Sequence, residues 1–126
     1  MDATYSKQEK LKKKKLIELL FQEGQSIKAF PVRLIYLPHA HNGPGHFQTG
    51  VSVSKKKFKS AVDRNRIKRL LREAYRLEKG ELTENPDTKK HLFMFIYFGD
   101  KEVSLESLRK SLRRTLKIFE EKQQRS

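Results

Sequence analysis

Six basic side chains are concentrated in residues 64–76, and their spacing suits chemistry with a polyanion. Four of them recur at every fourth position and would form one stripe along a helix: Arg64, Lys68, Arg72 and Arg76. Arg66 and Arg69 would add a second row, with Asn65 beside it. A guanidinium can bind phosphate through two hydrogen bonds, and an asparagine amide suits a sugar hydroxyl or a base edge. The pattern predicts a helix face that contacts several phosphates of a nucleic acid.

The alternative is an ordinary solvated helix face, which is the usual reason for a run of charges. Three features favour nucleic acid instead. Arginine outnumbers lysine in this segment, and few carboxylates lie four residues away to pair with it. In addition, Lys55, Lys56 and Lys57 precede the segment closely.

Other chemistry is poorly represented. His39, His41 and His46 lie in a glycine- and proline-containing loop without nearby carboxylates, a poor cage for a metal ion. Asp63 is explained more simply as a helix cap than as a metal ligand. No Ser-His-Asp spacing, paired-carboxylate motif or glycine-rich phosphate loop is visible. We therefore expect no catalytic residue and no metal site in the protein itself.

Composition agrees with a polyanionic partner. The 126 residues carry a formal net charge of +14, with 36% hydrophobic and 35% charged residues and no cysteine. Nucleic acid is the leading candidate partner, followed by an acidic membrane surface and an acidic protein. The absence of cysteine favours a reducing compartment, the cytoplasm. No apolar run is long enough for a membrane helix, and the lysine-rich N-terminus lacks the core of a signal peptide.

The elements that must position these residues form a single α+β domain. The sequence predicts six of them, in the order α-β-β-α-β-α: residues 13–22, 30–37, 47–54, 61–78, 91–98 and a last helix after Ser104. Ser60 and Asp63 would cap the second helix. Residues 91–98 are apolar at nearly every position, which predicts a strand buried on both faces. We expect flexible tails at about residues 1–10 and 120–126.

The strand at residues 47–54 would have one unusual face. Gly50, Ser52 and Ser54 are small, so another backbone could approach closely there. The lysine run at residues 12–15 would form a solvated arm near the partner.

Residues 61–73 (AVDRNRIKRLLRE) resemble the signature of the bacterial ribonuclease P protein component, and residues 50–56 (GVSVSKK) resemble the strand before that signature. The resemblance extends from about Leu11 to Phe119 and is weak in the loop at residues 39–46. It implies an α-β-β-α-β-α sandwich with a left-handed β-α-β crossover, resembling the second domain of a small-subunit ribosomal protein.

The resemblance also implies a function. Proteins of this family bind a catalytic RNA and the 5′ leader of precursor tRNA, and the RNA removes the leader with its own Mg²⁺, so the protein would hold no metal tightly. The residues implied to contact RNA are Lys55, Lys56, Lys57, Arg64, Asn65, Arg66, Lys68, Arg69, Arg72 and Arg76. Those implied to line a cleft for the single-stranded leader are Ile17, Phe21, Ile35, Ser52 and Lys56. For Phe21 an ordinary core position remains the alternative.

Two other functions stay open from the residues alone. One is a structural RNA-binding protein of the ribosome, and the other is a self-sufficient, metal-dependent nuclease. Because the net charge is +14, we also expect anions such as phosphate or sulfate to stabilise the free protein.

Overall fold

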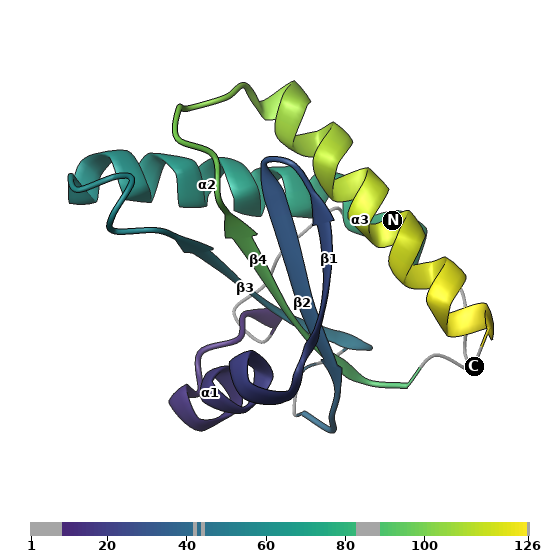
Figure 1. The fold of residues 1–126 in the computed structure, drawn as a ribbon. Coiled ribbons are helices and arrows are strands. Elements are labelled where there is room, and N and C mark those ends of the chain that lie inside the picture. The colour runs from purple at the N-terminus through teal and green to yellow at the C-terminus, as the bar shows by residue number, and fades with distance from the viewer. Residues whose placement is uncertain (1–8, 42, 44, 83–88, 126) are drawn as a thin grey trace.

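The computed structural model describes residues 9–41, 43, 45–82 and 89–125. They form a four-stranded mixed sheet between helices on both faces (Figure 1). The elements follow one another as α1 (Lys14–Glu23), β1 (Gln25–Ala29), β2 (Val32–Pro38), β3 (Phe47–Val53), α2 (Ala61–Glu78), a 3₁₀ turn (Lys79–Leu82), β4 (His91–Tyr97) and α3 (Leu105–Arg125). The α+β class and all six predicted elements are confirmed.

The order of the strands in the sheet is β1-β2-β4-β3. β1 pairs with β2, and β2 with β4, in antiparallel fashion, whereas β3 and β4 are parallel and are joined through α2. The prediction that β4 is buried on both faces is confirmed, because six of its seven residues are buried. A central strand flanked on both sides explains its nearly continuous apolar sequence.

One strand was missed from the sequence. β1 occupies Gln25–Ala29, and the strand predicted to begin at residue 30 begins instead at Val32. Phe30 lies in the turn between β1 and β2 with 69% of its surface exposed. β1 is a short edge strand with only Ile27 and Ala29 buried, so its two apolar side chains give a weak alternation.

The two faces of the sheet have separate cores. Helices α2 and α3 cover one face, and α1 lies on the opposite side (Figure 1). The larger core lies under α2 and α3 and includes Val32, Leu34 and Tyr36 of β2. Ile35 points the other way and joins Leu20 of α1, Leu92 and Met94 in a smaller core. β2 therefore contacts apolar groups on both faces, as its sequence predicts.

The helix boundaries follow from local signals. The Ser60 side chain accepts a hydrogen bond from the backbone N–H of Asp63, which confirms the Ser60 half of the predicted cap of α2. The Asp63 carboxylate lies 3.7 Å from Nη1 of Arg66. Ser104 accepts one from the N–H of Ser107 at the start of α3. Gly24 ends α1 where the helix crosses β2, and a Cβ there would lie 2.6 Å from Cγ2 of Ile35. A larger residue at position 24 would push α1 away from the sheet.

Parts of both predicted tails belong to described elements or contacts. Residues 1–8 and 126 lie outside the described residues, but Glu9 forms an ion pair with Lys79 at 2.8 Å. Lys10 forms a parallel bridge with Thr49 of β3. α3 continues through Arg125, inside the segment assigned to the C-terminal tail. Of the helices described, none is both long enough and apolar enough to cross a lipid bilayer.

A buried histidine makes the stability of this fold depend on pH. His91 is fully buried among Tyr36, Phe47, Phe93 and Phe119, and its Nδ1 lies 2.7 Å from the carbonyl oxygen of Lys89. Loss of water lowers the pKa of His91 below its usual 6.5, and the positive groups nearby add to this. A lowered pKa means that its contribution is complete above pH 6.5 and is lost as the pH falls towards the folded-state pKa.

We expect the free energy of unfolding to decline on acidification, and we expect His91→Phe to weaken that decline. Urea unfolding of both proteins at several pH values between about 7.5 and 5 measures this. Comparison with the variant separates His91 from His41, whose pKa is also lowered by burial. Equal pH dependence in the two proteins would contradict the assignment.

Candidate nucleic-acid interface

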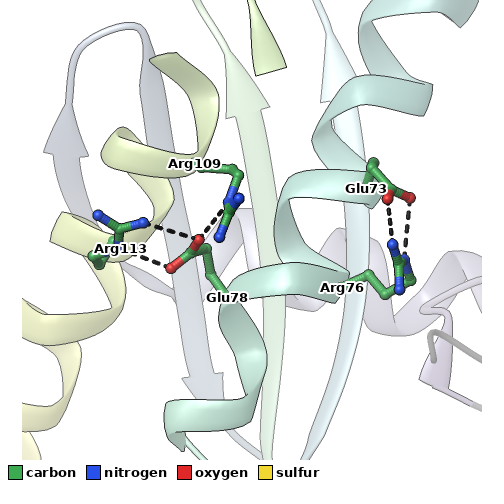
Figure 2. A network of polar contacts seen from close by, with 5 residues as sticks. All are labelled: Glu73, Arg76, Glu78, Arg109 and Arg113. Atoms are coloured by element: carbon green, nitrogen blue, oxygen red, sulfur yellow. Dashed lines mark hydrogen bonds and ion pairs between the residues drawn. The ribbon is translucent and has the colours of Figure 1, made fainter. Parts of the chain in front are cut away.

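The basic residues of α2 divide into those already paired within the protein and those open to a partner. Arg64 donates from Nη1 to the carbonyl oxygens of Phe58 at 2.7 Å and Lys59 at 2.9 Å, so it ties the preceding loop to the helix. Arg66 contacts Glu102 at 3.1 Å and Asp63 at 3.7 Å. Arg76 pairs with Glu73 on the same helix (Figure 2).

Four polar residues of α2 have no such partner. Within the described part of the chain, no ion pair or side-chain hydrogen bond engages Asn65, Lys68, Arg69 or Arg72. Asn65, Arg69 and Arg72 are exposed, and Lys68 is partly exposed. Unpaired and solvated cations are the ones that can bind phosphate without first breaking an internal contact. This reduced set forms the centre of the candidate interface.

Arg66 and Arg76, which form ion pairs at the surface, can still contribute to nucleic-acid binding. The Arg66 side chain is 53% exposed and Glu102 is 38% exposed, so their pair is a surface salt bridge worth about 0–1 kcal/mol. A phosphate could displace Glu102 at small cost. The hydrogen bond with Arg76 lowers the pKa of the Glu73 carboxyl, and the same contact raises the pKa of Arg76. Both side chains remain partly exposed, so a phosphate can still reach Arg76.

The lysines before α2 extend this surface. Lys55 and Lys56 are exposed, and the backbone N–H of Lys56 donates to the Ser54 hydroxyl. Lys57 is also exposed, but its Nζ donates to the carbonyl oxygen of Phe98 at 2.7 Å. The loop is therefore attached to the end of β4, which holds the lysines beside the first turn of α2.

The basic face of α3 is not wholly open to a partner. It comprises Arg109, Lys110, Arg113, Arg114 and Lys117. Glu78 at the end of α2 is 4% exposed and accepts hydrogen bonds from Arg109 at 2.7 Å and Arg113 at 2.9 Å (Figure 2). These contacts lower the pKa of Glu78, Arg113 contributing most, although burial opposes the shift. Two of the five basic residues of this face thus hold α2 against α3.

Two hollows lie beside β3 on the side of the sheet that α1 occupies, and we refer to them together as the groove. One hollow of about 130 Å³ lies between α1, β3 and α2, and its lining includes Ile17, Gly50 and Arg72 together with Lys10 and Lys12. A wider hollow of about 650 Å³ lies between the start of α1 and the loop after β2, lined by residues that include Lys13, Lys14, Lys15 and Gln48. Arg72 therefore connects the basic face of α2 to the groove.

The residues predicted to line the leader cleft fall in different environments. Ile17 lines the smaller hollow, and Phe21, one helical turn further along α1, is 47% exposed and belongs to neither core. The alternative of Phe21 as a core residue is therefore wrong, because Leu20 fills that role with no exposed surface. Ile35, in contrast, is 7% exposed beneath α1, which leaves almost no surface for a base.

The floor of the groove also differs from expectation. The backbone that approaches Gly50 belongs to the chain itself, because the Leu11 carbonyl oxygen would lie 3.5 Å from a Cβ there and the Leu11 N–H donates to Thr49. Ser52 lies further along β3, opposite Ile96 of β4, and is partly exposed. Lys56 is exposed, but neither Ser52 nor Lys56 lines either hollow. Arg72 and Lys12 are lining residues that the sequence did not place in the cleft.

His41 forms hydrogen-bond contacts within its own loop. His41 Nε2 lies 3.1 Å from the His46 carbonyl oxygen, and His41 Nδ1 accepts from the N–H of Gly43. Residues 42 and 44 lie outside the described part. Among the described residues, no three His, Cys, Asp or Glu side chains are grouped closely enough to hold a metal ion.

The fold and the site define a small α+β protein with a cationic helix next to a groove and with an exposed aromatic side chain on α1, features typical of proteins that bind nucleic acid. Residues 5–120 match the family described as Ribonuclease P. The chain belongs to the ribonuclease P protein family.

Similar proteins agree with this membership. The chain is 34% identical over 118 residues to the ribonuclease P protein component of Caldanaerobacter subterraneus subsp. tengcongensis, covering 90% of this chain and 94% of that one. It is 42% identical over 79 residues to that of Porphyromonas gingivalis, covering 63% of this chain but only 58% of the relative. The RNase P protein of Thermotoga maritima superposes with a TM-score of 0.67 at 26% identity, covering 86% of this chain and 94% of that structure. The RNase P protein of Staphylococcus aureus gives 0.66 at 26% identity, covering 86% and 93%.

Proposed function

We propose that this protein is the protein subunit of ribonuclease P, a ribonucleoprotein endoribonuclease. In this proposal it binds the catalytic RNA and the 5′ leader of precursor tRNA, and it assists hydrolytic removal of the leader to give the mature tRNA 5′ end. The observation that carries the proposal is the α2 face of Asn65, Lys68, Arg69 and Arg72, which is open to a polyanion and adjoins the groove through Arg72. The family membership supports the same function.

The chemistry of cleavage would belong to the RNA. Mg²⁺ held by the RNA would activate water and stabilise the leaving oxygen, as bound divalent ions do in phosphoryl transfer. The protein would supply charge compensation and positioning. Its cations would neutralise RNA phosphates near the active centre, and the groove would hold the leader in line with the scissile bond. Such a complex would work in the cytoplasm, where precursor tRNA is made.

The leader is proposed to lie along the groove from Arg72 towards Ser52 and Lys56. Single-stranded RNA is held by a cationic track and by side chains on which bases stack, and stacking tolerates any base. Phe21 offers such a surface, with Ile17 beside it as an apolar wall.

We expect Phe21→Ala to weaken binding of precursor tRNA to the complex of protein and catalytic RNA by about tenfold, because one stacked base contributes ~1–3 kcal/mol. Binding of mature tRNA should change little, since it lacks the leader. Equilibrium binding of both RNAs to wild-type and variant complexes measures the difference. Phe21→Tyr keeps the ring and serves as the matched control, whereas an equal loss for both RNAs would exclude Phe21 from a leader site.

Anions should stabilise the free protein, since its net charge is +14 and the groove hollows are lined by lysines. Sulfate or phosphate bound there would relieve repulsion and shift unfolding by mass action. We expect the melting temperature to be higher in sulfate than in chloride at equal ionic strength. Identical melting curves in the two salts would contradict specific anion binding.

A simple incubation tests the alternative of a self-sufficient nuclease. The purified protein with Mg²⁺ and precursor tRNA, but without catalytic RNA, should release no leader. Specific removal of the leader under these conditions would overturn the proposed division of labour.

A further inference from the structure

The most exposed large apolar side chain among the described residues lies away from the groove. Phe30, in the turn between β1 and β2, is 69% exposed, compared with 47% for Phe21. Most aromatic side chains described here are buried or partly buried. A single exposed aromatic side chain is ordinary by itself, so the groups around Phe30 decide whether it belongs to a binding surface.

The turn holds Phe30 in a defined position. Its ring packs edge-to-face against Phe98 with ring centroids 5.3 Å apart. The Ser111 hydroxyl of α3 donates to the Phe30 carbonyl oxygen at 3.1 Å, and the N–H of Phe98 donates to Pro31 at 2.9 Å. The Phe30 ring is thus supported by Phe98 while the side chain stays open to solvent, which is the preorganisation that a stacking platform needs.

The charge around Phe30 favours an anionic partner. A hollow of about 270 Å³ beside it is lined by Ala29, Phe30, Lys110, Ser111 and Arg114. Lys110 and Arg114 are exposed, and within the described residues neither has an acidic partner. They lie one position after Arg109 and Arg113, whose charges Glu78 already neutralises. α3 therefore uses one pair of cations internally and presents the next pair beside Phe30.

This surface is continuous with the candidate interface. Phe98, which supports the Phe30 ring, also accepts the hydrogen bond from Lys57. The strand end and the turn thus connect the lysines before α2 to Phe30 and then to α3. An aromatic platform flanked by Lys and Arg is the combination that binds an unpaired nucleotide, with the base on the ring and the phosphate on the cations.

We propose that Phe30, Lys110 and Arg114 form a second RNA contact, in which an unpaired nucleotide stacks on Phe30. This rests on the proposed function, because it assumes an RNA partner. The hollow is below the ~300–1,000 Å³ of sites for drug-sized ligands, so it fits a single base or phosphate group.

Fluorescence can test this directly, because the chain contains no tryptophan. Phe30→Trp places a single reporter in the site, and stacking on a base should quench its emission. Bacterial ribonuclease P RNA and precursor tRNA are titrated separately, so quenching by either one supports the proposal and identifies the source of the nucleotide. Lys122→Trp, on an exposed position of α3 outside the hollow, is the control and should not be quenched.

Affinity provides the second measurement. Phe30→Ser should weaken RNA binding about tenfold, and Phe30→Tyr should keep the wild-type affinity. Lys110→Ala and Arg114→Ala should each decrease the slope of log affinity against log salt by ~0.7–0.9, the value for one phosphate contact. Thermal unfolding of Phe30→Ser verifies that it folds.

Three results would overturn the proposal. RNA that binds with unchanged affinity to Phe30→Ser would refute the second contact, whether or not Phe30→Trp is quenched, while leaving the proposed function intact. RNA that fails to bind the wild-type protein would refute both. Emission of Phe30→Trp that changes with protein concentration in the absence of RNA would show that a second copy of the chain covers this surface.

Discussion

Replacing both arginines that face Glu78, in the variant Arg109→Ala/Arg113→Ala, is expected to lower the free energy of unfolding by about 3–5 kcal/mol. Glu78 is 4% exposed, and these two side chains provide its ion pairs (Figure 2). Without these arginines the Glu78 carboxylate stays buried as an uncompensated charge, and such a charge strongly destabilises the folded state. Urea unfolding of wild type and variant at neutral pH measures the loss.

The pH dependence of the free energy of unfolding shows whether the Glu78 carboxylate causes this loss. In the wild type the arginines lower the pKa of Glu78, so its contribution is lost as the pH falls through the folded-state pKa. In the variant only desolvation acts on it, which favours the neutral acid and removes the penalty on protonation. The difference in stability between the two proteins should therefore be largest at neutral pH and should shrink in acid.

Lys110→Ala/Arg114→Ala is the matched control for stability. It removes two positive charges from the same helix, one position further on, at exposed sites outside the Glu78 contacts. We expect its free energy of unfolding to change by less than about 0.5 kcal/mol. Equal losses in the two double variants would mean that the charges of α3, and not the Glu78 contacts, determine the result.

The second large effect concerns RNA affinity. Arg69→Ala/Arg72→Ala removes two exposed arginines that have no acidic partner within the described residues. Each charge-assisted contact contributes roughly 1.5–3 kcal/mol, so the affinity for catalytic RNA should fall by about 100-fold or more. The slope of log affinity against log salt should decrease by about 1.5, because each lost phosphate contact removes ~0.7–0.9.

Arg66→Ala should weaken RNA binding less than Arg69→Ala or Arg72→Ala does alone. Arg66 must leave Glu102 before it binds a phosphate, and Glu102→Gln should accordingly strengthen RNA binding. Lys122→Ala, which removes one charge from α3 far along the sequence, is the control for net charge. Filter binding at several salt concentrations compares each variant with the wild type. Slopes of log affinity against log salt that equal the wild-type slope would remove the α2 face from the interface.

Local signals in the sequence were sufficient for most of the fold. Ser60 and the apolar spacing of Ile67, Leu71 and Ala74 determine α2, and the apolar run of β4 reveals a central strand. β1 is not predicted by the sequence because it has five residues, of which only two are buried, and so shows almost no apolar alternation. The apolar side chain of Phe30 made the next strand appear to begin two residues early, in what is a turn. The exposure of a side chain in a turn depends on packing, which periodicity does not report.

The candidate site was predictable in composition but not in detail. The basic residues of α2 are visible in sequence, yet which of them are free depends on partners far along the chain. Arg66 meets Glu102 after 36 residues, and Arg113 meets Glu78 after 35. Phe21 and Ile35 show the same limit, since both are apolar residues in regular elements and only the position of α1 leaves one open and covers the other.

The most direct test of the central claim is reconstitution of precursor tRNA processing. The protein is combined with a bacterial ribonuclease P RNA and a precursor tRNA at a low Mg²⁺ concentration at which the RNA alone is nearly inactive, and mature 5′ ends are counted. The proposed function predicts that wild-type protein restores cleavage at the mature 5′ end and that Arg69→Ala/Arg72→Ala does so only at much higher protein concentration. Cleavage that is no faster with the protein than without it would contradict the claim.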